Sequence, residues 1–314
     1  MTEAQEPRAK GDFPGLTSYL EREAGNVEAA LERALERLPV AVASDEALRE
    51  AIAHGLTGGG KRLRPILCAA AWSACRQNES PPPALYDLAV ALEMIHAYSL
   101  MHDDLPCMDD AELRRGRPTT HRVHGEAATV RAGAALIPAA ALQALSACEA
   151  LACPEERTEA ATRALLEAAG AGGMVGGQWL DLLGEHETLG PDELNDLHRR
   201  KTGALLAASL VVGSIAAGAP ADVVDALERY GRSIGLAFQI ADDILDATAS
   251  AETLGKNPSD AELDKSTYVS LYGLDEAGRR ARAQVDEARA ALRHAGLDAP
   301  ALEALAGFVV ERAK

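Results

Sequence analysis

The residues in this sequence that could do chemistry are aspartates at the ends of two apolar segments. The first cluster, in HAYSLMHDDLPCMDD (96–110), places four aspartates within eight positions. The second, DDILD (242–246), places Asp242 and Asp246 four residues apart, which on an α-helix puts both carboxylates on one face, about 6 Å apart. Oxygen ligands at this spacing favour a hard cation, and Mg²⁺ usually shares its coordination with waters and substrate phosphates.

The first cluster needs a break in its helix before its members could share an ion. Asp103 and Asp109 are six residues apart, or about 240° around a regular helix, and Pro106 between them clashes with the preceding turn. Close carboxylates raise one another's pKa unless cations offset the repulsion. One such run is more often a solvated helix end, but two runs together with separate basic clusters favour a metal site. His96 lies on the same helix face as Asp103.

Lysines and arginines gather in short segments that contain Gly or Pro. These segments are GGGKRLRP (58–65), LRRGRP (113–118) and HRRKTG (198–203), followed by the separate Lys256 and Lys265. Such loops present cations and backbone N–H groups to a diphosphate. The pattern G-x-x-x-x-G-K that ends at Lys61 is similar to a P-loop, but Arg62 stands where a P-loop has Ser or Thr, and no strand precedes it.

Composition favours an all-α protein. Ala, Leu, Arg and Glu are abundant, and aromatic residues make up only 4% of the chain, so helix propensity exceeds strand propensity almost throughout. Helical patterns with short Gly or Pro breaks follow a polar segment, 1–14, which we expect to be a frayed tail. We expect residues 15–314 to form one bundle-like domain of about ten or more helices.

Charge and hydropathy argue against several classes of protein. The formal net charge is −17 and the pI is near 4.9, whereas nucleic-acid binding draws on a basic surface. The N-terminus has no apolar core of a signal peptide, and the weakly polar run 204–219 is short for a bilayer span. Five cysteines without a CxxC pair suit reduced thiols. We expect a cytoplasmic protein with no nucleic-acid partner and no membrane span.

Five segments in a fixed order carry a resemblance to a known family. They are GGKRLRP (59–65), IHAYSLMHDDLPCMDDAELRRGRPT (95–119), GGQWLDL (176–182), HRRKTGALL (198–206) and FQIADDILD (238–246). Over roughly residues 45–275 the chain resembles the trans-isoprenyl diphosphate synthases, or polyprenyl synthetases, and within them the bacterial farnesyl and geranylgeranyl diphosphate synthases. The resemblance implies a deep central cavity, a homodimer, and three Mg²⁺ ions between the acidic helix ends and an allylic diphosphate.

The resemblance also implies a role for each matching residue. The Mg²⁺ ligands would be Asp103, Asp104, Asp109, Asp242 and Asp246. The allylic diphosphate would be held by Arg114, Lys201, Lys256 and Lys265. Isopentenyl diphosphate would be held by Lys61, Arg64, His96 and Arg115. Catalysis would involve Arg114 and Lys201, with Thr202 and Gln239 lining the reaction centre.

These roles fit a condensation that proceeds by ionisation. Breaking an allylic C–O bond leaves an anionic diphosphate, which metal ions, lysines and arginines stabilise. The allyl cation needs an apolar cavity that excludes water. The double bond of isopentenyl diphosphate then attacks the cation, and a proton is lost to the departing diphosphate.

The family resemblance implies that a bulky side chain on the helix before the first acidic motif ends growth of the prenyl chain. Tyr98 lies five residues before Asp103, about 7.5 Å further back along the axis, where an aromatic ring can floor the cavity. This favours farnesyl diphosphate (C15), made from dimethylallyl and geranyl diphosphates. If neighbouring helices set the cavity depth, Tyr98 is an ordinary core aromatic and geranylgeranyl diphosphate (C20) is the alternative product.

Two rival functions fit the motifs less well, and the chain departs from the family at two places. A terpene cyclase normally has Asn or Asp followed by Ser or Thr and Glu in place of DDILD, and a non-catalytic partner subunit would be expected to lack complete aspartate clusters. Ala134 stands where relatives usually have Asp, which suggests a missing polar contact below the site. The segment 256–265 looks one residue short, with Asp264 in place of Gly, and this bears on Lys265.

Overall fold

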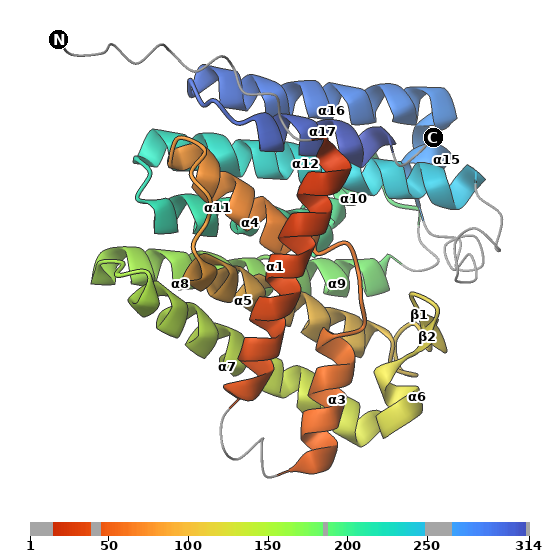
Figure 1. Ribbon diagram of the computed structural model, residues 1–314. Coiled ribbons are helices and arrows are strands. Elements are labelled where there is room, and N and C mark those ends of the chain that lie inside the picture. The colour runs from red at the N-terminus through yellow and green to blue at the C-terminus, as the bar shows by residue number, and fades with distance from the viewer. Residues whose placement is uncertain (1–14, 39–44, 185–187, 249–265, 312–314) are drawn as a thin grey trace.

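The computed structural model describes residues 15–38, 45–184, 188–248 and 266–311, most of them helical (Figure 1). The helices are α1 (Leu16–Glu36), α3 (Glu46–Leu56), α4 (Leu63–Cys75), α5 (Pro83–Asp103), α6 (Thr120–His124), α7 (Glu126–Ala150), α8 (Glu155–Ala169), α9 (Met174–Leu183), α10 (Pro191–His198), α11 (Ala204–Ala217), α12 (Ala221–Thr248), α15 (Tyr268–Tyr272), α16 (Leu274–His294) and α17 (Pro300–Glu311). A π-helical turn, η1 (Arg199–Gly203), joins α10 to α11. The strands among these residues, β1 (Leu113–Arg114) and β2 (Arg117–Pro118), form one hairpin. The expected all-α class is confirmed.

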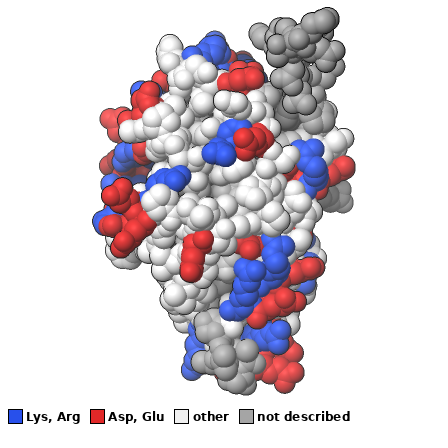
Figure 2. Space-filling view, turned by 60° about the vertical axis from the view of Figure 1, so that its left-hand side comes forward, with Lys and Arg blue, Asp and Glu red and all other residues white. Residues whose placement is uncertain are grey.

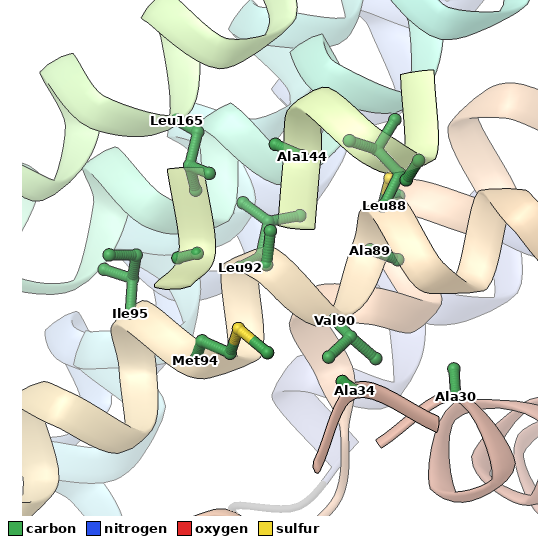
Figure 3. Close-up of a cluster of buried hydrophobic side chains, with 14 of the residues drawn as sticks. Ala30, Ala34, Leu88, Ala89, Val90, Leu92, Met94, Ile95, Ala144 and Leu165 are labelled. Atoms are coloured by element: carbon green, nitrogen blue, oxygen red, sulfur yellow. The ribbon is translucent and has the colours of Figure 1, made fainter. Parts of the chain in front are cut away.

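Helix α5 lies inside the bundle because apolar side chains cover its whole circumference. Buried residues occur on every side of it between Leu85 and Met101. Figure 3 shows Ala30 and Ala34 of α1 on one side of α5, with Ala144 of α7 and Leu165 of α8 on another. Alanines at these contacts let the neighbouring helices approach closely and hold α5 in a densely packed core. The position of Asp103, at the end of α5, is therefore set by packing along the whole helix.

A buried carboxylate ties the first half of α5 to its neighbours. Asp87 accepts hydrogen bonds from Arg33 Nη2 of α1 at 2.6 Å and from Arg37 Nη1, directly after α1, at 3.0 Å. Gln143 Nε2 of α7 donates to the Asp87 carbonyl oxygen at 2.9 Å. Because the two arginines compensate the buried charge, this pairing fixes the orientation of α1 and α7 against α5 without leaving an unpaired ion.

Helix α12 carries the second acidic cluster near its C-terminus. Its apolar face, which includes Tyr230 and Ile234, is buried, and α12 packs mainly against α11 and α16. Tyr230 Oη donates to the Leu302 carbonyl oxygen of α17 at 2.6 Å. In Figure 1 the C-terminal ends of α5 and α12 lie toward the same side of the bundle. The fold thus places two acidic helix ends, far apart in the sequence, at one end of the molecule.

Two stretches of the described helices are long and apolar enough to cross a bilayer, judged by length and composition alone. The segment Pro191–Ala217 is one of them, and 67% of its most apolar part is buried inside the bundle, as in a core helix. Helix α7 is the other and is only 39% buried in the corresponding part, with Leu142 and Leu145 exposed. The expected absence of a membrane span stays a prediction, and α7 presents an apolar face that another surface could cover.

Surface charges of opposite sign lie close together. On the face shown in Figure 2, lysines and arginines lie next to aspartates and glutamates, and uncharged residues cover much of the area between them. Pairs one helical turn apart include Arg163 with Glu159 and Arg232 with Glu228. Such exposed pairs contribute little to stability. Their acidic members offset the charge of arginines that would otherwise attract anions.

Candidate active site

A cavity of about 410 Å³ opens between α5, α9 and η1. Six of the predicted site residues line it, namely Arg64, His96, Tyr98, Asp103, Lys201 and Thr202. Much of the remaining wall is apolar and includes Met174, Val175 and Trp179 of α9. A cavity that combines cations and a carboxylate with an apolar wall suits a ligand with a charged head and a hydrocarbon tail.

The first acidic motif leaves the helix at Asp103 and continues as a tight turn. The Asp109 N–H donates to the Asp103 carbonyl oxygen at 2.9 Å, and the Asp110 N–H donates to that of Leu105 at 3.1 Å. Pro106 lies inside this turn, where its missing N–H removes no helical hydrogen bond. The predicted break at Pro106 therefore takes the form of a turn after the helix end, and it returns Asp109 to the backbone of Asp103.

Asp104 is buried and bound to an arginine. Arg114 on β1 reaches Asp104 Oδ1 with Nε at 2.7 Å and with Nη2 at 2.6 Å. This ion pair connects the β1–β2 hairpin to the end of α5, and the cation of Arg114 offsets part of the negative charge of the motif. The structure thus brings Asp104 and Arg114 together, and their predicted roles stay predictions.

Burial disfavours the ionised form of Asp103, and a nearby cation would favour it. Burial raises the pKa of Asp103 to about 6, Lys201 lowers it, and the neighbouring Asp109 raises it again. Lys201 Nζ in turn donates to Asp181 Oδ2 at 2.7 Å. Asp181 lies in the motif GGQWLDL, but the sequence alone predicts no role for it. Its pairing with Lys201 could not be inferred from spacing because the two residues lie on different elements.

The π-helical turn η1 sets the position of Lys201 and Thr202. Extra turns of this type occur often at functional sites because they redirect a side chain within an otherwise regular helix. Gly177 of α9 lies directly against this turn, and a Cβ at Gly177 would come within 2.1 Å of the Lys201 backbone nitrogen. The second glycine of GGQWLDL is therefore required by the close approach of α9 to η1, and it keeps Lys201 within reach of Asp181.

The aspartates of the second acidic motif lie in two different environments. Asp243 is buried and accepts a hydrogen bond from the Tyr268 backbone N–H at 2.7 Å, so it holds the start of α15. Asp242 and Asp246 are half-buried and lie one turn apart on α12. Carboxylates on one helix face suit a hard cation such as Mg²⁺.

A metal ion at this site would need more than the protein's own ligands. No group of three or more His, Cys, Asp or Glu side chains, among those the structure describes, is placed to hold an ion by itself. The available donors are carboxylate oxygens, and the raised pKa of Asp103 shows that a nearby cation would be favoured. These residues fit Mg²⁺, which keeps several waters and shares ligands with substrate phosphates.

The inner end of the cavity is cationic. Arg64 Nε is shielded from solvent and has no hydrogen-bond partner within the described parts of the chain. Burial lowers the pKa of the Arg64 guanidinium to about 10, and burial together with Arg64 and Arg115 holds the pKa of His96 well below its usual range. A buried donor without an acceptor is costly. An anionic ligand would satisfy Arg64, and neutral His96 could donate a hydrogen bond to it.

Arg115 lies beside this cationic end on the hairpin. Its Nη1 donates to the Gly59 carbonyl oxygen, and its guanidinium occupies the space that a Cβ on Gly60 would fill. Gly60 has a φ of +129°, a region that residues with a side chain rarely adopt. The glycines of GGKRLRP are therefore needed both for the backbone conformation and for the packing of Arg115.

Arg62 is a buried residue with a structural role that its place in the motif GGKRLRP does not predict. Its Nη1 donates to Glu93 Oε1 at 2.7 Å, its Nε to Glu28 Oε1 at 2.7 Å, and its Nη2 to the Leu56 carbonyl oxygen at 3.0 Å. Its backbone is left-handed, with φ 48° and ψ 33°, directly before α4 begins. These bonds hold a conformation that is strained for a non-glycine residue and orient the segment that carries Lys61 and Arg64.

Some predicted residues are not brought to the cavity. Lys61 is exposed and Gln239 is half-buried on α12, and neither is among the described residues that line the cavity. The same holds for the other predicted residues that the structure describes, namely Asp104, Asp109, Arg114, Arg115, Asp242 and Asp246. Ala134, where the relatives usually have Asp, is exposed on α7. Lys256, Asp264 and Lys265 lie outside the described residues, so their predicted roles stay predictions.

The fold and this cavity place the chain among the all-α isoprenyl diphosphate synthases. Residues 45–296 match the family described as Polyprenyl synthetase. Over 310 residues the chain is 41% identical to farnesyl diphosphate synthase from Escherichia coli, covering 96% of this chain and all of the relative. It is 40% identical to geranylgeranyl pyrophosphate synthase 9 from Arabidopsis thaliana, covering 86% of this chain and 74% of the relative.

A solved structure has the same fold. The apo crystal structure of an FPP/GFPP synthase from Zymomonas mobilis superposes with a TM-score of 0.81 at 35% sequence identity, over 94% of this chain and 99% of the other. The chain belongs to the polyprenyl synthetase family, as the resemblance of its motifs predicts.

We predict that Arg62→Met weakens binding of inorganic diphosphate, measured by titration calorimetry in EDTA, about tenfold or more, since tenfold corresponds to about 1.4 kcal/mol. The reason is that the segment carrying Lys61 and Arg64 loses its anchor on Glu93. Asp87→Asn is the control, because it removes the charge of another buried carboxylate of α5 that pairs with arginines. Both changes should destabilise the fold by roughly 3–5 kcal/mol, and equal diphosphate affinity in the two variants would refute the role given to Arg62.

Proposed function

We propose that the protein is a short-chain trans-prenyltransferase that condenses isopentenyl diphosphate with dimethylallyl and geranyl diphosphates to give farnesyl diphosphate. The observation that carries this proposal is the unpaired, buried Arg64 Nε in a cavity wall that also contains Asp103, at the start of the acidic turn, and the cation of Lys201. The cavity thereby offers places for two diphosphates, one bound directly by cations and one through metal ions. A terpene cyclase would need only one.

The residues of the chain divide the reaction between them. Arg64 and His96, with Arg115 and Lys61 beside them, would bind the diphosphate of isopentenyl diphosphate. Lys201, held by Asp181 at 2.7 Å, would stabilise the negative charge that develops on the allylic diphosphate as the C–O bond breaks. The apolar wall from α9 would keep water away from the allyl cation until the second substrate attacks it.

Bound Mg²⁺ would supply positive charge to the leaving diphosphate. The residues that would hold it are Asp103 and Asp109 on one side and Asp242 and Asp246 on the other, with Asp104 in support. Three ions per site is the number we propose from the family resemblance. Arg114, paired with Asp104, would then contribute both to the acidic cluster and to the allylic diphosphate.

Tyr98 supports the C15 product. Its ring lines the cavity on the α5 side, and it lies further from the acidic turn than Asp103 along the helix. A growing prenyl chain directed along α5 would meet this ring. The C20 product stays the second candidate, because one relative at 40% identity is a geranylgeranyl pyrophosphate synthase.

We also propose that two copies pair through the apolar face of α7. On this helix Leu142 is 55% exposed and Leu145 is 42% exposed. Exposed apolar residues at this spacing form a stripe along one helix face, which usually marks an interface. A homodimer of one-domain subunits in the cytoplasm fits this surface and the family resemblance.

The proposed function is tested by incubating the purified protein with Mg²⁺, isopentenyl diphosphate and each of the C5, C10 and C15 allylic diphosphates, then sizing the products. Asp103→Asn and Asp242→Asn should each lower kcat/KM about 100-fold or more, because charge on the leaving diphosphate loses its counterions. Asp110→Asn, in the same aspartate run but exposed and left-handed at φ 44°, is the control and should retain activity within about threefold, since Asn tolerates that conformation. No condensation by the wild-type protein would sink the proposal.

Tyr98→Ala should lengthen the main product by one isoprene unit, from C15 to C20, because the cavity loses the ring proposed as its floor. Product sizing by chromatography measures this directly. Tyr98→Phe is the control and should keep the C15 product, since it retains the ring. If Tyr98→Ala still makes C15, the stop for chain growth lies on another helix.

Light scattering on a size-exclusion column should give twice the chain mass of 32.9 kDa for the wild-type protein. Leu142→Glu with Leu145→Glu should give the single-chain mass, because charges placed in an apolar interface are costly to bury. Leu274→Glu, at an exposed leucine of α16, should leave the dimer intact. A dimer that persists in the double variant would place the interface elsewhere.

A further inference from the structure

Tyr98 does not stand alone in the cavity wall. His102, one helical turn further along α5, also lines the cavity, and the two rings meet edge to face, with centroids 4.9 Å apart and planes at 76°. Residues four apart share a helix face, and this geometry is a favourable one for two aromatic rings. The Tyr98 ring therefore packs against the His102 ring.

His102 is itself held by α7. Its Nε2 donates to the Val130 carbonyl oxygen at 3.2 Å. A carbonyl oxygen only accepts, so this bond fixes both the tautomer and the ring orientation. The imidazole also occupies space that opens only because residue 133 is a glycine, since a Cβ there would lie 2.4 Å from Nε2 and 2.6 Å from Cδ2. Gly133 thus leaves the space that the His102 ring occupies.

We propose that His102 is a positioning residue for product length, which acts by holding the Tyr98 ring across the cavity while Gly133 gives it room to do so. The proposal rests on the proposed function, because it needs Tyr98 to stop chain growth. Without support, the Tyr98 side chain would turn about its staggered rotamers and would block the cavity for only part of the time. The product of the reaction is therefore set by a contact chain that runs from α7 through His102 to Tyr98.

The contacts from α7 through His102 to Tyr98 predict opposite changes in product length for two variants. His102→Ala removes the support, so the C20 share of the product should rise at least fivefold over that of the wild-type protein. Gly133→Ala forces the imidazole away from α7, toward Tyr98 and the cavity, so the C10 share should rise instead. Gly133 is not among the described residues that line the cavity, and a general loss of stability would not shift products in opposite directions.

The experiment measures the ratio of C10, C15 and C20 products at equal conversion, which does not depend on the amount of folded enzyme. Gly25→Ala is the matched control, because Gly25 is also helical and a Cβ there meets nothing within 4 Å; it should leave the ratio unchanged. In the Tyr98→Ala background, adding His102→Ala should change nothing further, since the histidine acts through the tyrosine. His102→Asn, which keeps a donor for Val130 but loses the ring, replaces His102→Ala if that variant does not fold.

Different failures have different meanings. If Tyr98→Ala lengthens the product while His102→Ala gives the wild-type ratio, the positioning role is overturned and the proposed function stands. If His102→Ala lengthens the product further in the Tyr98→Ala background, His102 is part of the floor itself and does not act through Tyr98. If the wild-type protein condenses no substrate, the proposed function fails and this inference fails with it.

Discussion

Repulsion between carboxylates is the constraint on which the rest of this structure depends. The ends of α5 and α12 bring two aspartate clusters to one end of the bundle, and burial raises the pKa of Asp103 to about 6. The fold offsets part of this charge with Arg114 on Asp104 and with Lys201 near Asp103. What remains is an excess of negative charge that suits Mg²⁺ shared with a diphosphate.

The part of the cavity wall around Arg64 has an excess of positive charge instead. Arg64 and His96 crowd together with few acidic neighbours, and buried Glu93 is committed to Arg62 at 2.7 Å. The left-handed backbone at Arg62 and the glycines before it place this cationic end beside the hairpin, where Arg115 joins it. An anion would relieve the cations at this end as Mg²⁺ would relieve the carboxylates at the other, and the apolar wall between them suits a hydrocarbon tail.

The sequence predicts more of the fold than of the side-chain pairing. Helix propensity and the order of the motifs indicate the all-α class and the family, and Pro106 locates the turn that returns Asp109 to Asp103. Spacing along the chain says nothing of pairs that form between elements, so Asp181 with Lys201 and the inward orientation of Arg62 could not be predicted. The Tyr98–His102 contact, at a spacing of four on one helix, was accessible in principle; the room that Gly133 provides on α7 was not.

The most direct test of this account is a crystal structure grown with Mg²⁺, isopentenyl diphosphate and an allylic thiolodiphosphate that does not ionise. The account predicts Mg²⁺ between Asp103 and Asp109 on one side and Asp242 on the other, each ion sharing the thiolodiphosphate. It also predicts the second diphosphate on Arg64 and His96. Metal ions bound at only one aspartate cluster without the diphosphate, or both diphosphates at the acidic end, would contradict it.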